Sequence, residues 1–305
     1  MPALRHEDFA AHLQTGPKRL GLTTKEEQAW CRWYGAEVYD GRGVIVEWGA
    51  WLGSLTTSYC EGLASNPSVP ASGTVAYAFD LFRWAKWCED QVKDTEHAGK
   101  LRVGESFLDY FRTLHRPYTR FLEVRAADLA SCEWHGPEIQ LIVNDAVKTL
   151  AIGENVFRRF LPALVPGTGL LANQDYLWPT DAFLTVLMYL TRDCFDFEYA
   201  LPDSCMVIFR CRRPPDPGLV RLPAALSEID PKLFAEAFAW SRKTVRMTPL
   251  AMIDLRHAVT LWQGGFREEA KRLVRDARLG QKNGSPMYDF QLEVLRSWGY
   301  DQLFD

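Results

Sequence analysis

Five carboxylates follow segments that the sequence pattern marks as buried strands. An apolar, β-branched run precedes each acid, and a helical pattern or a turn comes after it. In a parallel sheet the carboxyl ends of the strands meet at one edge, which is where such folds bind their ligands. We therefore expect these acids in one row along that edge: Glu47, Asp80, Asp128, Asp145 and Asp175.

The first acid lies in the segment Val44-Ile-Val-Glu-Trp-Gly-Ala-Trp-Leu-Gly53, which is typical of a strand, a tight turn and a helix start. Gly49 allows the backbone to turn beside a ligand, and Gly53 allows the helix to begin close to the strand. The free N–H groups of a helix start favour polar or anionic ligand groups. The pattern predicts a nucleotide site. A strand and a helix that only pack in the hydrophobic core would give the same pattern.

The glycine spacing differs from the G-x-G-x-x-G of dinucleotide-binding folds. The segment Glu47-Trp-Gly-Ala-Trp-Leu-Gly53 instead resembles the first motif of class I S-adenosylmethionine (SAM) dependent methyltransferases. This resemblance implies that Glu47, Gly49, Trp51, Gly53 and Ser54 hold the amino-acid end of SAM. Trp51 stands where many members have a third glycine, and some small-molecule O-methyltransferases, including the macrocin type, also carry a bulkier residue there.

Two further acids are candidates for the nucleoside. Asp80 ends the expected strand 74–80, and an acid after the second strand accepts the two ribose hydroxyls in nicotinamide and SAM enzymes alike. Asp128 ends the expected strand 121–128, and the methyltransferase resemblance implies that it lies near the adenine amino group. Asp128 would serve equally well as a helix cap.

Asp145-Ala-Val-Lys148 places a carboxylate and a lysine at the expected start of a helix, over the same edge. Asp145 and Asp175 could share Mg²⁺, with Gln174 or Asn173 as a weaker neutral ligand. Such a cation would lower the pKa of a substrate hydroxyl, and Lys148, with its own pKa lowered by that charge, could remove the proton. If neither neutral side chain binds the cation, the site is metal-free. A separate alternative is that Asp145 only caps a helix and Lys148 is a solvated helix residue.

This D-x-x-K arrangement resembles that of metal-dependent catechol O-methyltransferases. Gln174-Asp175-Tyr176 resembles the Asp-Asp-Tyr of macrocin-type sugar O-methyltransferases, with glutamine in place of the first acid. The resemblances imply methyl transfer from SAM to a hydroxyl of a small molecule, a glycoside or another secondary metabolite. One alternative is a catalytically inactive binding or scaffold protein of this fold, suggested by Trp51 and the incomplete metal triad. A nicotinamide dehydrogenase is disfavoured by the first-turn spacing.

The elements that must position these residues indicate a doubly wound α/β fold. Five parallel strands, closed by an antiparallel pair at 195–201 and 205–211, give the mostly parallel seven-stranded, Rossmann-like sheet of class I methyltransferases. A helix is expected over Thr180–Thr191. The chain divides into an N-terminal helical cap (1–40), a SAM-binding domain (41–213) and a C-terminal helical region (219–305), which is expected to pack on the domain or to dimerise.

About 40 residues separate the second and third strands, which is far more than the usual connection. They are consistent with a lid or substrate-recognition segment, or with one crossover helix and a disordered surface loop.

Composition limits the possible partners. The chain has 305 residues and a net charge of −4, so it offers no broad cationic face, and nucleic acid is not expected as a partner. No apolar run is long enough to span a bilayer and no signal-peptide pattern is present, so we expect a cytoplasmic protein that does not bind membranes. The seven cysteines contain no C-x-x-C pair and the six histidines show no metal spacing. The expected partners are a small-molecule acceptor and, through the helical regions, a second copy.

Overall fold

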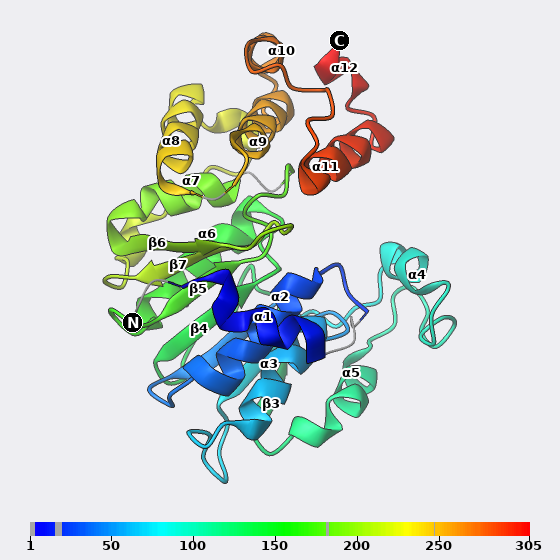
Figure 1. The fold of residues 1–305 in the computed structure, drawn as a ribbon, viewed down its shortest axis with the longest axis vertical. Coiled ribbons are helices and arrows are strands. Elements are labelled where there is room, and N and C mark those ends of the chain that lie inside the picture. The colour runs from blue at the N-terminus through cyan, green and yellow to red at the C-terminus, as the bar shows by residue number, and fades with distance from the viewer. Residues whose placement is uncertain (1–3, 16–19, 181–182, 247) are drawn as a thin grey trace.

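A seven-stranded sheet forms the centre of the computed structural model, which describes residues 4–15, 20–180, 183–246 and 248–305 (Figure 1). The strand order is β3-β2-β1-β4-β5-β7-β6. The first five strands in this order are parallel, and β7 is antiparallel to both of its neighbours, β5 and β6, so the predicted doubly wound, mostly parallel sheet is confirmed. The strands are β1 (Val44–Trp48), β2 (Ala76–Asp80), β3 (Leu122–Ala126), β4 (Ile139–Asn144), β5 (Leu170–Asn173), β6 (Phe195–Ala200) and β7 (Val207–Cys211).

Both faces of the sheet are covered, which explains why its central strands are apolar on both sides. In β1, Val46 and Trp48 belong to the core on one face, whereas Ile45 belongs to the core on the other. Because side chains alternate along a strand, Glu47 shares the face of Ile45 and points toward the helix that follows β1. The alternation therefore sets the environment of the first acid.

The face of Ile45 is covered by α1 (His6–Thr15), α2 (Lys25–Trp33) with its π-helical continuation Tyr34–Val38, and α3 (Ser54–Ser65). Helix α2 begins with a capping box between Thr24 and Glu27, one of the two that the sequence offers. The opposite face is covered by α6 (Leu150–Arg159) and α7 (Phe183–Leu190). Residues 181 and 182 of the helix expected over Thr180–Thr191 lie outside the described residues.

The long connection between β2 and β3 contains two helices, α4 (Lys86–Val92) and α5 (Leu108–Leu114). Phe111 of α5 is buried against α3, so this helix serves as the crossover. Helix α4 lies outside the sheet, at the end where the strands reach their carboxyl termini (Figure 1). Short 3-10 helices occur at Arg116–Tyr118, Leu161–Ala163, Arg192–Cys194, Pro217–Leu219 and Leu226–Glu228.

Among the described residues after the hairpin there are five α-helices: α8 (Pro231–Thr244), α9 (Leu250–Gln263), α10 (Arg267–Asp276), α11 (Pro286–Ser297) and α12 (Asp301–Phe304). Helix α8 packs on α7, α9 packs on α8 and α10 packs on α9 (Figure 1). Their apolar side chains join the core of that face, as Phe238 and Ile253 show. In the described part of the chain, no helix has the length and hydropathy needed to cross a membrane.

Candidate functional site

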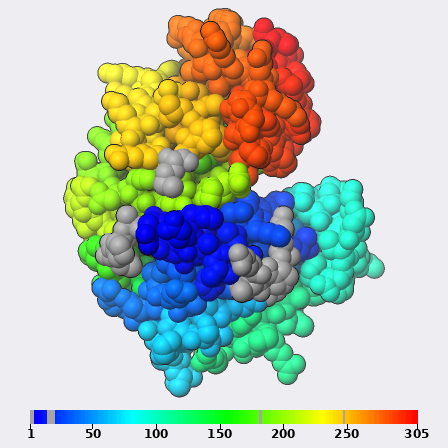
Figure 2. Space-filling model, in the orientation of Figure 1, coloured from blue at the N-terminus to red at the C-terminus, as the bar shows by residue number. Residues whose placement is uncertain are grey.

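A cleft of about 1020 Å³ opens at the carboxyl ends of the parallel strands. All five acids expected in a row line it: Glu47, Asp80, Asp128, Asp145 and Asp175. Its walls come from the turn after β1, the segment through α4, the first turn of α2 and one face of α11. Figure 2 shows the molecule hollowed between the C-terminal helices and the segment that contains α4.

The turn between β1 and α3 depends on two glycines. Gly49 has a φ of +85°, and a Cβ there would lie 2.7 Å from the carbonyl oxygen of Asp145. Gly53 has a φ of +80° at the position before α3, and a Cβ there would lie 2.2 Å from Cε1 of His115. Both positions need glycine for conformation and for space. Gly49 thus allows the end of β1 to lie against Asp145 after β4, and Gly53 allows the start of α3 to lie against His115.

Trp51 adopts a φ of +42°, a left-handed conformation that is uncommon for a bulky residue. Its backbone N–H donates to Oδ2 of Asp80 at 2.9 Å, which ties the turn to the end of β2. Its indole packs against Trp87 of α4, with ring centroids 5.1 Å apart. Trp51 therefore forms a wall of the cleft beside Asp80.

Asp80 accepts the N–H of Phe82 at 2.8 Å as well as that of Trp51. Burial raises the pKa of its carboxyl, while the backbone donors act in the opposite direction. Each carboxylate oxygen has a second lone pair, so Asp80 keeps the capacity to accept from ligand hydroxyls.

Glu47 is buried beneath this turn. Thr56 and Tyr59, both from α3, donate to its Oε2, the tyrosine at 2.9 Å. Burial raises the pKa of Glu47 to about 8, although both hydrogen bonds lower it. At neutral pH the neutral acid therefore predominates, and Glu47 can donate as well as accept hydrogen bonds.

Ser54 and Asp128 lie on the cleft but are engaged locally. The hydroxyl of Ser54 is 3.0 Å from that of Thr23, which precedes α2. Oδ1 of Asp128 accepts the N–H of Ala130 at 2.9 Å within a turn. No helix begins there in the described chain, so the expected alternative of a helix cap is wrong and Asp128 stabilises a turn instead.

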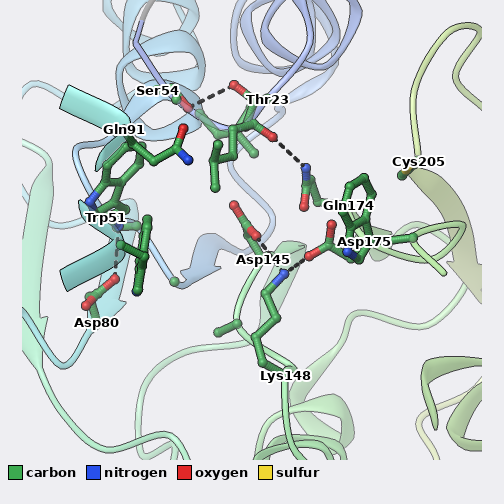
Figure 3. Close-up of a pocket in the computed structure, with 18 of the residues that line it drawn as sticks. Thr23, Trp51, Ser54, Asp80, Gln91, Asp145, Lys148, Gln174, Asp175 and Cys205 are labelled. Atoms are coloured by element: carbon green, nitrogen blue, oxygen red, sulfur yellow. Dashed lines mark hydrogen bonds and ion pairs between the residues drawn. The ribbon is translucent and has the colours of Figure 1, made fainter. Parts of the chain in front are cut away.

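Lys148 lies between two acids (Figure 3). Its ammonium forms an ion pair with Asp175 and another with Oδ1 of Asp145 at 3.3 Å. The helix α6 starts later than expected, because Thr149 is its N-cap and accepts the N–H of Ile152. The expectation that Asp145 caps the helix is therefore wrong. Lys148, whose side chain is 46% exposed, is partly solvated and also ion-paired.

The expected Mg²⁺ site does not fit this arrangement. The Lys148 ammonium already forms ion pairs with both carboxylates that would be ligands, and it lies where a shared cation would bind. Gln174, the third expected ligand, donates its side-chain N–H to the carbonyl of Leu22 at 3.3 Å and to the Glu27 carboxyl, and its Oε1 is buried without a hydrogen-bond partner. A single amide oxygen beside two carboxylates that are already ion-paired is a weak ligand set. Among the described residues no group of three His, Cys, Asp or Glu side chains could hold a metal ion. Magnesium is not supported, and the ammonium takes the place of the cation.

Glu27 was not expected at the site. It is buried, its Oε2 accepts the N–H of Thr24 at 2.9 Å, and Ser204 donates to its Oε1 at 2.5 Å. Burial raises the pKa of Glu27 to about 7, and the charge of Asp145 acts in the same direction. The sequence identifies Glu27 as part of a capping box, but no local pattern indicates that the first turn of α2 lies over the cleft.

Helix α11 was not expected at the site either. Its residues Met287, Phe290, Val294 and Trp298 line the cleft opposite α4. The helical pattern of this segment could be read from the sequence, whereas its place over the sheet edge depends on how five helices pack.

Comparisons with known proteins give weak likenesses only. No family model and no curated protein matches the chain. Among solved structures, a SAM-dependent O-methyltransferase from Thermotoga maritima is 11% identical, with 64% of this chain and 69% of that one covered and a TM-score of 0.39. A mitomycin 7-O-methyltransferase is 12% identical (61% and 53% covered, TM-score 0.33), and the 23S rRNA methyltransferase ErmE is 13% identical (92% and 98%, TM-score 0.36). Similarities of this size say nothing about activity.

Proposed function

We propose that this chain is a SAM-dependent methyltransferase that transfers a methyl group to a hydroxyl of a small molecule, such as a glycoside or another secondary metabolite. One observation carries the proposal. The glycine turn after β1 and the carboxylate that ends β2 are joined by the bond from Trp51 N–H to Asp80, and both face one cleft at the carboxyl edge of the sheet. A nucleoside joined to an amino acid needs these two kinds of group side by side.

The cleft has residues suited to each part of SAM. The backbone at Gly49 and Gly53 would pass close to the amino-acid end, because neither position has room for a side chain. Asp80 would accept the ribose hydroxyls, and Asp128 would lie near the adenine. Glu47, held by Thr56 and Tyr59, and Ser54 would provide hydrogen bonds beneath the turn.

Bound SAM would supply a methyl group on a positively charged sulfonium. Asp145 or Asp175 would take the proton of the acceptor hydroxyl, and the Lys148 ammonium beside them would stabilise the oxygen as it becomes negative. The oxygen would then form its bond to the methyl carbon as the carbon–sulfur bond breaks, leaving a thioether. In this scheme Lys148 acts as a fixed positive charge, because two carboxylates favour its protonated form.

Calorimetry with S-adenosylhomocysteine tests the cofactor assignment. We expect saturable binding that Asp80→Asn weakens about tenfold, the cost of one hydrogen bond to a charged group. Asp109→Asn, an exposed carboxylate of α5, is the control and should bind as the wild type does.

Absence of binding by the wild type would reject the proposal. Tight binding without methyl transfer to any screened hydroxyl compound would favour the inactive binding or scaffold protein instead.

A further inference from the structure

Helix α11 has two apolar faces. Tyr288, Leu292 and Leu295 are buried in the C-terminal core. A second stripe, with the three- and four-residue spacing of one helix face, lines the cleft: Met287, Phe290, Val294 and Trp298. Phe290 is 51% exposed and Trp298 54% exposed, although both are large and apolar. Exposed aromatic side chains gathered on the wall of a cleft indicate a ligand surface.

Trp178 extends this surface toward the acids. It follows β5 three residues after Asp175, and its ring centroid lies 6.2 Å from that of Phe290 and 6.0 Å from that of Trp298. We call Trp178, Phe290 and Trp298 the aromatic wall. The wall begins beside the Asp145–Lys148–Asp175 group, so a ring held on it could present a hydroxyl there.

Two buried side chains fix the wall in place. Gln291, on the buried side of α11, donates to the carbonyl of Leu177 at 2.9 Å. Arg256 of α9 donates to the carbonyl of Trp178 at 3.0 Å and to Thr185 at 2.6 Å. The loop after β5 and α11 are therefore held together as one surface, which a ligand would meet already formed.

The size and charge of the cleft limit the ligand. Its volume of about 1020 Å³ lies at the top of the roughly 300–1,000 Å³ range of small-molecule sites, which leaves room for an acceptor beside a cofactor. Acids outnumber bases on its lining, where the bases are Arg83 and Lys148. Lys148 is already paired with two carboxylates, so an anionic acceptor would meet net repulsion.

We infer that the aromatic wall binds the acceptor, and that the acceptor is an uncharged aromatic compound carrying a hydroxyl. This inference rests on the proposed function, which defines the acceptor as the molecule that receives the methyl group. It narrows the substrate class from hydroxylated small molecules in general to aromatic ones. Ring stacking on Phe290 and Trp298 supplies the affinity. The C-terminal helical region thereby acts as the substrate-recognition part of the molecule.

The test measures binding of 2-naphthol to the full chain by calorimetry, with and without S-adenosylhomocysteine. Decahydro-2-naphthol, which has the same skeleton without aromatic rings, and the anion 2-naphthoate are compared with it. We expect 2-naphthol to bind at least about fivefold more tightly than either, the size of one aromatic contact. Phe290→Ala and Trp298→Ala should each weaken it about fivefold. Affinity for S-adenosylhomocysteine should stay unchanged.

Leu250→Ala is the matched control, because Leu250 is an exposed apolar residue of the same helical region that does not line the cleft. It should leave 2-naphthol binding unaltered. Equal binding of the saturated alcohol or the anion, no binding of 2-naphthol, or binding unaffected by both variants would each overturn the inference. The inference would also be overturned if sedimentation showed a wild-type dimer that Phe290→Ala and Trp298→Ala dissociate. A second copy of the chain would then cover the aromatic wall. If the wild type bound 2-naphthol as expected but did not bind S-adenosylhomocysteine, the proposed function would be rejected and the aromatic binding site would remain supported.

Discussion

Carboxyl groups that line this one cleft have different surroundings, and their pKa values depend on those surroundings. Glu47 and Glu27 are buried among neutral donors, so burial raises their pKa values to about 8 and about 7. Asp145 and Asp175 have an ammonium between them, and an opposite charge favours the ionised form. The site therefore combines two buried acids whose pKa values are raised with two acids that share one ammonium.

The raised pKa of Glu47 predicts a pH-dependent stability. The folded chain holds this proton up to about pH 8, whereas the ordinary value in an unfolded chain is 4.5. Between these values the folded state binds more protons, so the free energy of unfolding falls as the pH rises, by up to about 1.4 kcal/mol per pH unit for this group. Glu47→Gln should lose that part of the slope and gain stability relative to the wild type from pH 5 to 8, measured by urea unfolding.

Glu27 contributes in the same direction up to about pH 7, so Glu47→Gln should reduce the slope without abolishing it. Glu268→Gln, which changes an exposed carboxyl of α10, should leave the slope of the wild type unchanged. A variant slope equal to that of the wild type would contradict the assignment of a raised pKa to Glu47.

The position of Lys148 predicts a metal site that exists only when the lysine is removed. Lys148→Met leaves Asp145 and Asp175 facing each other without a cation, and two nearby carboxylates attract a divalent ion. We expect saturable Mn²⁺ binding by Lys148→Met in electron paramagnetic resonance titrations. The wild type and Lys148→Arg, which keeps the charge, should show none at the same concentrations. Tight binding of Mn²⁺ by the wild type would restore the magnesium hypothesis.

At the scale of elements, local patterns were enough to predict some parts of the site. The turn from β1 to α3 could be predicted because a buried strand, two glycines and a helix start are all local to ten residues. The mostly parallel sheet with an antiparallel hairpin could be predicted from the series of strand patterns, whereas the strand order is seen only in the structure. The sequence predicts that Lys148 lies near Asp145 and Asp175, because all three follow strand ends at one edge of the sheet. Its ion pair with Asp175 cannot be predicted, because it depends on where β4 and β5 end relative to each other.

The contributions of α2 and α11 could not be predicted, because they depend on packing between segments far apart in the chain. Glu27 reaches Ser204 in the hairpin between β6 and β7, and Gln291 reaches the loop after β5. No periodicity or motif specifies such pairs. The amphipathic pattern of a helix says that it has a buried face, and it does not say which surface buries it.

The contact between β1 and β4 predicts a large effect for one glycine. In Gly49→Ala the new methyl would lie 2.7 Å from the backbone oxygen of Asp145, and backbone atoms cannot rotate away as a side chain can. We expect a loss of about 3 kcal/mol in the free energy of unfolding, from steric overlap added to the cost of a positive φ. Denaturation in urea would measure it.

Gly73→Ala separates the two causes of that loss. Gly73 also has a positive φ, +109°, but a Cβ there would meet nothing within 4 Å. It should therefore cost only about 1 kcal/mol, the conformational part. Equal losses for both variants would mean that the approach of the two strand ends does not limit the turn.

At the scale of the whole molecule, the C-terminal helices and the sheet share one core. Phe209 of β7 and Phe234 and Phe238 of α8 belong to the same buried cluster, and Trp240 stacks on Phe209. Arg256 adds a polar link: its side chain is 1% exposed and it crosses from α9 to the loop that carries Trp178. The three-part division of the chain remains a prediction, but this shared core favours cooperative unfolding of the last two parts.

Arg256→Met tests this coupling. The substitution removes the hydrogen bonds from Arg256 to the Trp178 carbonyl and to Thr185. Because these acceptors then lack that donor inside the protein, we expect the free energy of unfolding to fall by about 3 kcal/mol. If the core is shared, far-ultraviolet circular dichroism and tryptophan fluorescence will report one transition in urea for wild type and variant alike, displaced to lower urea in the variant.

The exposed Arg275 of α10 supplies the control, since Arg275→Met should not move the midpoint. Two separate transitions, with only one displaced, would instead show that the helical region unfolds independently. The aromatic wall would then sit on a part of the molecule that can loosen without disturbing the acids beneath it.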